Sequence, residues 1–192
     1  MELTLGLIIL IVLMYGLKAP TLRLATFCLG VILLMSAMGA GLLAEPHLLC
    51  WTQAIKMLVM LSGLAILCML DHRASHRSSS LLILLVILGN LLLIGSTNLI
   101  SIYLALEMQT LCMFILVAYN KNSLLSAEAG LKYFVLGALS SGLFLFGCAL
   151  IYGSTGELEL QFIRMSLISY GALAGKCLIT VSLLFKVSAA PF

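Results

Sequence analysis

Charge is what this sequence has least of. Asp, Glu, Lys and Arg make up 9% of the 192 residues, whereas roughly a quarter of the residues of an average soluble protein are charged. Hydrophobic residues make up 63%, and the mean hydropathy is +1.24. So little charge cannot cover a water-soluble domain, and an excess of 10 Lys and Arg over 7 Asp and Glu is too small to indicate nucleic-acid binding. The composition predicts an integral membrane protein.

The sequence also lacks the motifs with which proteins hold redox cofactors. It contains no GxGxxG stretch, no P-loop and no grouped ligands for haem or iron–sulfur clusters. Its six cysteines stand singly, without a C-x-x-C pair, and are interpreted as small hydrophobic residues of apolar helices. We expect no cofactor and no metal on this chain, and any redox chemistry to lie on another one.

A cleavable leader is missing too. The N-terminal stretch MELTLGLIILIVLMYGL has neither a basic start nor a small-residue cleavage site, and it is not an Arg-rich transit peptide. We therefore expect a retained first helix, in a chain that is either bacterial or made inside an organelle.

Long hydrophobic runs are what the sequence has in abundance. Each is close to the 17–25 residues with which a helix crosses a bilayer, and only helices satisfy their backbone there without neighbours. The predicted fold is all-α: a polytopic membrane helical bundle of about seven transmembrane helices, divided into a three-helix segment, 1–79, and a four-helix segment, 80–192. The predicted spans are 3–18, 22–44, 49–70, 80–97, 99–119, 127–152 and 167–190.

Basic residues concentrate in alternate loops, and loops rich in Lys and Arg face the cytoplasm or the matrix. The N-terminus is therefore expected to face outward. The first, third and fifth loops carry Lys18, Arg23, Arg73, Arg77 and Lys121, whereas the second, fourth and sixth carry only Arg164.

A few charges remain inside the predicted spans, and each is costly to place in hydrocarbon. They are Lys56, Glu107, Lys132, Lys176 and Lys186. Such residues normally face one another or a water-filled cavity, so each marks a candidate functional site.

Glu107 and Lys186 are the predicted pair. Glu107 lies about 12 Å into its span, near the middle of a hydrocarbon core about 30 Å thick. Lys186 lies deep in the last span, which runs in the same direction. A neighbouring lysine stabilises the carboxylate and desolvation favours the neutral acid, so moving the lysine would load or release a proton. Proton or ion translocation is the favoured interpretation, and a static ion pair that fixes helix packing is the alternative.

Lys132 follows Glu128 at the i, i+4 spacing of an intrahelical ion pair. Ser126 is predicted to cap this helix, which would put Glu128 in the first turn. Lys132 then belongs either to an interfacial pair or to a polar path through the membrane. Lys176 is expected to snorkel to the outer interface, and Lys56 is ambiguous.

Two stretches predict how the last helices pack and end. GALSSGLFLFG, 137–147, is rich in small residues that let a neighbouring backbone approach closely. In LLFKVSAAPF, 183–192, Pro191 is expected to break the last helix directly after its lysine. Broken helices beside buried charges are typical of transporters.

These stretches resemble a known family. SAEAGLKYFVLGALSSGLFLFGCALIYGSTG (126–156), LALEMQTL (104–111) and LLFKVSAAPF are similar to the second membrane subunit of respiratory complex I, NADH:ubiquinone oxidoreductase, which is an antiporter-like proton-pumping subunit. The resemblance is good over 99–192 and rests only on the pattern of apolar spans over 1–98. It implies that 80–192 is an incomplete first antiporter-like repeat, the first part of an antiporter-like fold.

The resemblance also implies roles and partners. Glu107 and Lys186 match the family's proton-transferring Glu–Lys pair, and Lys132 matches a lysine of its polar axis. Partner subunits would hold NADH, FMN, iron–sulfur clusters and ubiquinone. Members of the family continue past the final Pro-Phe, so we expect a split gene, with a second chain carrying the remainder, in preference to a truncated sequence.

The implied location is the mitochondrial inner membrane, with the N-terminus in the intermembrane space, because LEMQTL and YGSTG look like plant, algal or protist mitochondrial versions. A bacterial plasma membrane is the alternative. Two other functions stay open: a subunit of a stand-alone cation/proton antiporter, and a non-transporting membrane scaffold.

Overall fold

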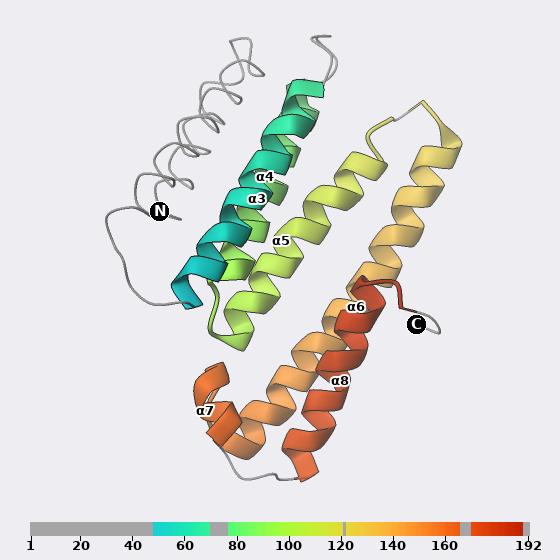
Figure 1. Ribbon diagram of the computed structural model, residues 1–192. Helices are drawn as coiled ribbons and strands as arrows, with labels where there is room; N and C mark the ends of the chain where they lie inside the picture. The colour runs from blue at the N-terminus through green and yellow to red at the C-terminus, as the bar shows by residue number, and fades with distance from the viewer. Residues whose placement is uncertain (1–47, 70–76, 121, 166–169, 190–192) are drawn as a thin grey trace. The chain divides into compact units, whose positions relative to one another are not determined.

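The computed structural model describes residues 48–69, 77–120, 122–165 and 170–189, and these segments are helical apart from their connections. The helices are α3 Leu48–Met69, α4 Arg77–Gly95, α5 Leu99–Val117, α6 Leu124–Thr155, α7 Leu160–Met165 and α8 Tyr170–Lys186 (Figure 1). The all-helical prediction is therefore confirmed over this part of the chain. The predicted spans 3–18 and 22–44 lie outside the described residues.

The helices belong to two compact units, one ending at Gly95 and the other starting at Ser96. The predicted division into 1–79 and 80–192 marks where an antiporter-like repeat is expected to begin. The boundary between the two compact units does not test it, so this division stays a prediction. In the first unit α3 packs against α4. Gly63 permits this contact, because a Cβ at that position would overlap the Ile87 side chain.

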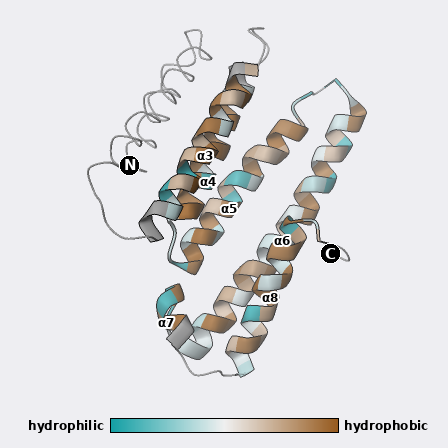
Figure 2. Ribbon diagram, viewed as in Figure 1, coloured by the Kyte–Doolittle hydropathy of each residue, from teal (hydrophilic) through white to brown (hydrophobic). Residues whose placement is uncertain are grey.

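Among the described residues two helices, α5 and α6, are each long and apolar enough to cross a bilayer. Shorter apolar helical stretches run over Trp51–Leu67 and Ser79–Gly95. Large apolar side chains such as Leu104 and Leu139 are exposed on the chain, which suits lipid or partner helices rather than water. In Figure 2 the ribbon of α5, which is brown over much of its length, is teal (hydrophilic) near its middle.

The second unit starts at a capped helix. The Asn98 side chain accepts a hydrogen bond from the Ile100 N–H at 3.1 Å, as an N-cap does. Asn98 also forms an isolated antiparallel bridge with Glu159, which ties the start of α5 to the start of α7. The sequence analysis missed helix α7, because its six residues lie within the loop expected between the spans 127–152 and 167–190.

The connection from α5 to α6 corrects one prediction. The N-cap of α6 is Ser123, so Glu128 lies beyond the first turn. Ser126 does not cap α6; its hydroxyl donates to the Val117 carbonyl at 2.7 Å, which satisfies the end of α5 instead.

Helices α6 and α8 pack along each other in opposite directions (Figure 1). They approach each other closely at Gly147 and Gly175, where a Cβ on Gly175 would lie 2.7 Å from the Gly147 carbonyl oxygen. Close approach within the stretch 137–147 is therefore confirmed at its last residue. A small core of Leu99, Phe144, Cys148, Ile151, Ile163 and Ile179 lies beside this crossing.

Helix α8 ends at Lys186, earlier than predicted and five residues before Pro191. The Ala189 N–H donates to the Leu184 carbonyl at 3.0 Å and the Ser188 N–H donates to the Phe185 carbonyl at 3.0 Å. With Ser188 at a φ of 58°, this is a Schellman motif. A backbone turn, rather than the proline, ends the described helix directly after its lysine.

Candidate functional site

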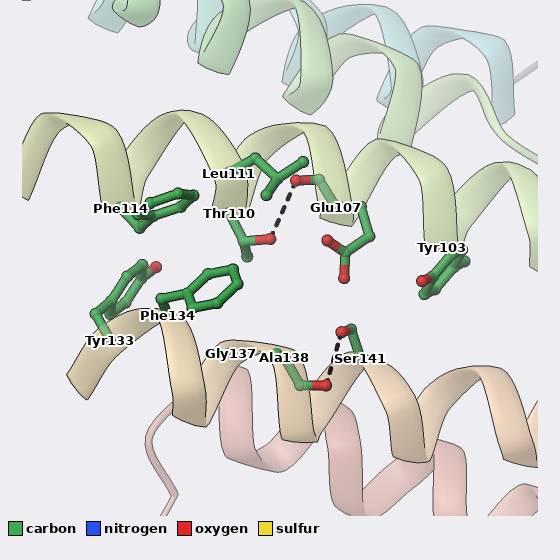
Figure 3. A pocket seen from close by; sticks show the side chains of 10 residues that line it. All are labelled: Tyr103, Glu107, Thr110, Leu111, Phe114, Tyr133, Phe134, Gly137, Ala138 and Ser141. Carbon is green, nitrogen blue, oxygen red and sulfur yellow. Dashed lines mark hydrogen bonds between the residues drawn. The ribbon is translucent and has the colours of Figure 1, made fainter. Parts of the chain in front are cut away.

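Glu107 occupies a small cavity between α5 and α6. The cavity has a volume of about 140 Å³ and is lined by both helices. In Figure 3 the Glu107 carboxylate points from α5 toward α6, and the Ser141 hydroxyl points back toward it. Tyr103 and Thr110, one turn before and after Glu107, line the same cavity. An acid group therefore faces a space with several polar side chains in its lining, inside an otherwise apolar pair of helices.

Two hydroxyls that line the Glu107 cavity, those of Thr110 and Ser141, already use their protons on the backbone. Thr110 Oγ1 donates to the Glu107 carbonyl at 3.1 Å, and Ser141 Oγ donates to the Ala138 carbonyl at 3.0 Å. A hydroxyl has one donor and two acceptor lone pairs, so each presents acceptors to the cavity. A protonated Glu107 can donate to such acceptors, whereas an ionised one needs a donor such as water or the Tyr103 phenol, which lines the same cavity.

Lys186 lines a second, larger cavity of about 350 Å³, formed by α5, α6 and the end of α8. Polar side chains of Gln109 and Ser140 line it as well. Lys186 is half-buried and is the last residue of α8, where the partial negative charge of the helix end favours a cation. The Lys186 amine therefore faces this cavity, as the Glu107 carboxylate faces the first cavity.

The structure brings Glu107 and Lys186 to the same level but does not join them. The lysine cavity includes Leu106, Gln109 and Thr110, which flank Glu107 on α5, and the two charges interact electrostatically. Within the described residues no nitrogen–oxygen distance of 4.0 Å or less links them. The expected buried ion pair is thus replaced by an acid and a base in neighbouring cavities, because Glu107 points toward α6 while Lys186 ends α8.

Lys132 lies apart from both cavities. Its ammonium forms an ion pair with Glu128 one turn earlier, which confirms the predicted i, i+4 pair. The two side chains are 68% and 59% exposed on this chain, so the pair is superficial here. Lys176 is exposed on α8, and Lys56 is partly buried on α3, in the other unit.

Tyr103, Thr110 and Gly137 are site residues that the sequence analysis did not single out. The first two stand at i−4 and i+3 from Glu107, on the same face of a helix, so the spacing alone would have found them. Gly137 was noted only within the stretch 137–147, where it was taken to permit close helix packing and not to line a cavity. Among the described residues no group of three or more His, Cys, Asp or Glu side chains gathers as metal ligands do.

Comparison with known proteins places the chain in a family. The profile described as NADH:quinone oxidoreductase/Mrp antiporter, TM, matches residues 96–192, and that described as NADH dehydrogenase subunit 2 N-terminal matches residues 1–93. Both match stretches that together contain every candidate residue discussed above.

Individual relatives indicate the same family. The chain is 51% identical over 125 residues to NADH-ubiquinone oxidoreductase chain 2 of Metridium senile, covering 60% of this chain and 32% of the relative. It is 38% identical over 184 residues to the protein of the same name from Oenothera berteroana, covering 84% of this chain and 38% of the relative. The chain thus spans about a third of the length of these relatives.

A solved structure shares the fold. A chain of respiratory complex I from Thermus thermophilus, solved with bound aureothin, matches with a TM-score of 0.83 and 28% identity, over 100% of this chain and 45% of that one. The all-helical membrane fold of an antiporter-like subunit is therefore shown. The chain belongs to the NADH:quinone oxidoreductase/Mrp antiporter family, within which it is related to NADH dehydrogenase subunit 2.

Proposed function

We propose that this chain is part of the membrane arm of a proton-pumping NADH:quinone oxidoreductase, and that Glu107 and Lys186 exchange protons there. The observation that carries the proposal is that Glu107, an acid, lines one cavity between apolar helices while Lys186, a base, lines the neighbouring cavity. NADH oxidation and quinone reduction take place on partner subunits, which hold FMN, iron–sulfur clusters and ubiquinone. This chain contributes proton translocation only.

The separation of the two side chains supports transport over a static role. An ion pair that only fixed helix packing would be in direct contact, because burying two charges apart from each other costs more than burying them together. Cavities large enough for water let each group change its protonation without a fixed partner. Lys132, paired with the adjacent Glu128, is a candidate for the path that leads protons to or from this site.

Location follows from the same family. The relatives named NADH-ubiquinone oxidoreductase chain 2 favour the mitochondrial inner membrane for this chain, with its N-terminus in the intermembrane space. Bacterial relatives named NADH-quinone oxidoreductase subunit N keep the bacterial plasma membrane as the alternative.

A stand-alone cation/proton antiporter is the second candidate, because the family description covers Mrp antiporters as well. The two differ in their partners. Native electrophoresis of solubilised membranes, followed by an in-gel NADH dehydrogenase stain, separates them: a complex I subunit migrates with the stained band, and an antiporter subunit does not.

Substitution Glu107→Gln tests the proton role directly. The amide keeps the size of the side chain but cannot carry the proton, so general acid–base transfer at this position is lost, an effect of typically about 10²–10⁴-fold on a proton-transfer step. We expect NADH-driven proton pumping in membrane vesicles to fall while the complex still assembles.

The matched control is Glu157→Gln, which removes a carboxylate from the exposed turn after α6. It is expected to pump as the parent does. Unchanged pumping in Glu107→Gln would contradict the proposal, and loss of assembly in that variant would favour the scaffold function instead.

A further inference from the structure

The two cavities adjoin along one strip of α5 and α6. Three residues line both of them: Thr110 on α5, and Tyr133 and Gly137 on α6. Two consecutive serines further along α6 divide between them, because Ser141 lines the carboxylate cavity and Ser140 lines the lysine cavity. The boundary between acid and base is therefore one turn of α6 facing Thr110.

Gly137 is the residue of this boundary that has no side chain. A Cβ built there would meet nothing within 4 Å, although the residue is only half-exposed. At Gly147 and Gly175, by contrast, a Cβ would run into the opposing backbone. Gly137 thus serves neither close helix packing nor a positive φ, and it weakens a helix interior. What it supplies is space.

That space is lined by groups that hold water. The Thr110 hydroxyl and the Tyr133 phenol border both cavities, and Gln109 extends the polar lining on the lysine side. The volumes, about 140 Å³ and about 350 Å³, exceed the roughly 30 Å³ that one water occupies in the liquid. Both linings also contain apolar side chains, such as Phe114 in the first cavity and Leu136 in the second, but a cavity of this size with several hydrogen-bonding groups is a place where ordered waters bind.

We propose that Gly137 keeps open a water-filled passage between the Glu107 cavity and the Lys186 cavity. The inference rests on the proposed function and deepens it. In the passage the O–H bond of the Glu107 carboxyl breaks and its proton goes to a bridging water; another proton of that water forms the new N–H bond of the Lys186 amine. A neutral acid and amine become a carboxylate and an ammonium, and the water is regenerated.

The experiment replaces Gly137 in the assembled, membrane-embedded complex with alanine and with leucine. Gly142→Ala and Gly142→Leu are the matched controls, since Gly142 is also on α6, also has no atom within 4 Å of its Cβ position, and lines neither cavity. We expect Gly137→Leu to lower NADH-driven pumping about threefold or more and Gly137→Ala to lower it less, with both Gly142 variants close to the parent.

A second measurement reads the passage without relying on pumping. In Gly137→Cys the new thiol should react with a small water-soluble thiol reagent, located by peptide mass spectrometry, because its site is wet. The buried native thiols of Cys112 and Cys148 provide unreactive references in the same digest. The labelling of Gly137→Cys also tests whether the passage holds water if the Gly137→Leu subunit fails to assemble.

The outcomes separate the two proposals. Normal pumping in Gly137→Leu, together with reduced pumping in Glu107→Gln, overturns the passage and leaves the proton role of Glu107 intact. Normal pumping in Glu107→Gln overturns both. Equal losses in Gly137→Leu and Gly142→Leu, or no labelling of Gly137→Cys, also overturn the passage.

Discussion

At the scale of single residues, Ser188 has the most unusual backbone conformation of the described part of the chain. It adopts the left-handed conformation with a φ of 58°, a region that an L residue other than Gly, Asn or Asp seldom enters. It does so where α8 ends, next to Lys186, and it lines the lysine cavity. Local backbone strain of this kind tends to cluster at functional sites.

Substitution Ser188→Gly should relieve that strain. Glycine adopts positive φ without a Cβ penalty, so the turn after α8 should become more stable by about 1 kcal/mol. The amide of Ala189, which donates to the Leu184 carbonyl, should then exchange with deuterium more slowly in the assembled complex. Ser188→Ala keeps the Cβ and should exchange like the parent; faster exchange in the glycine variant would contradict the strain.

Residue-level chemistry was largely readable from the sequence. A carboxylate in an apolar run is anomalous in any membrane helix, so the sequence alone indicated Glu107 as a candidate site residue. The spacing of Glu128 and Lys132 predicted their ion pair. Two features were not readable. Ser126 bonds to the end of α5 instead of capping α6, a contact that depends on how the loop folds. The Schellman motif that ends α8 usually has a glycine at its left-handed position, so a serine at position 188 did not predict it.

At the scale of helices, the crossing of α6 and α8 at Gly147 and Gly175 holds the second unit together. Small residues there allow the two backbones into contact, and membrane helices pack mainly through such contacts because lipid provides no hydrophobic driving force between them. Adding side-chain volume at this point forces backbone to move, since the opposing atom is a carbonyl oxygen.

Substitution Gly175→Leu should therefore destabilise the subunit. Overpacking a close contact typically costs about 1–3 kcal/mol, and we expect less of the chain to remain in the complex after detergent solubilisation and mild heating, measured by native gel. The control is Gly153→Leu, at a position on α6 whose Cβ would meet nothing within 4 Å. Equal retention of the two variants would show that the crossing does not carry the packing.

Helix positions followed from hydropathy because bilayer thickness fixes the length of an apolar run. The start of α5 at Leu99 was predicted to the residue. Helix α7 was missed because six residues are too few to show a 3.6-residue period. The ends of α6 and α8 differ from the prediction by a few residues, since capping bonds rather than hydrophobicity decide them.

At the scale of the whole chain, orientation in the membrane can be tested through α6. Its 32 residues make a helix about 48 Å long, longer than a hydrocarbon core of about 30 Å. We therefore expect the two ends of α6 to lie on opposite sides of the bilayer. The basic loop that holds Lys121 is expected on the matrix or cytoplasmic side.

Single-cysteine labelling decides this point. In Lys121→Cys a membrane-impermeant maleimide should label the new thiol in inverted vesicles and not in right-side-out ones, and in Glu157→Cys the pattern should reverse. Labelling of both variants from one side would contradict a membrane-spanning α6. The reversed pattern would place the N-terminus on the inner side and overturn the predicted orientation.

The contact between Gly147 and Gly175 lies far along α8 from Lys186, so a small tilt of α8 about this contact would move the lysine. Lys186 lies eleven residues beyond Gly175 on the same helix, or about 16 Å along its axis. If α8 tilted by about 10° about this contact, the end of the helix would move through about 3 Å by the geometry of the helix. That is the length of one hydrogen bond. A slight rocking of α8 is enough to make or break a water link to the Lys186 amine.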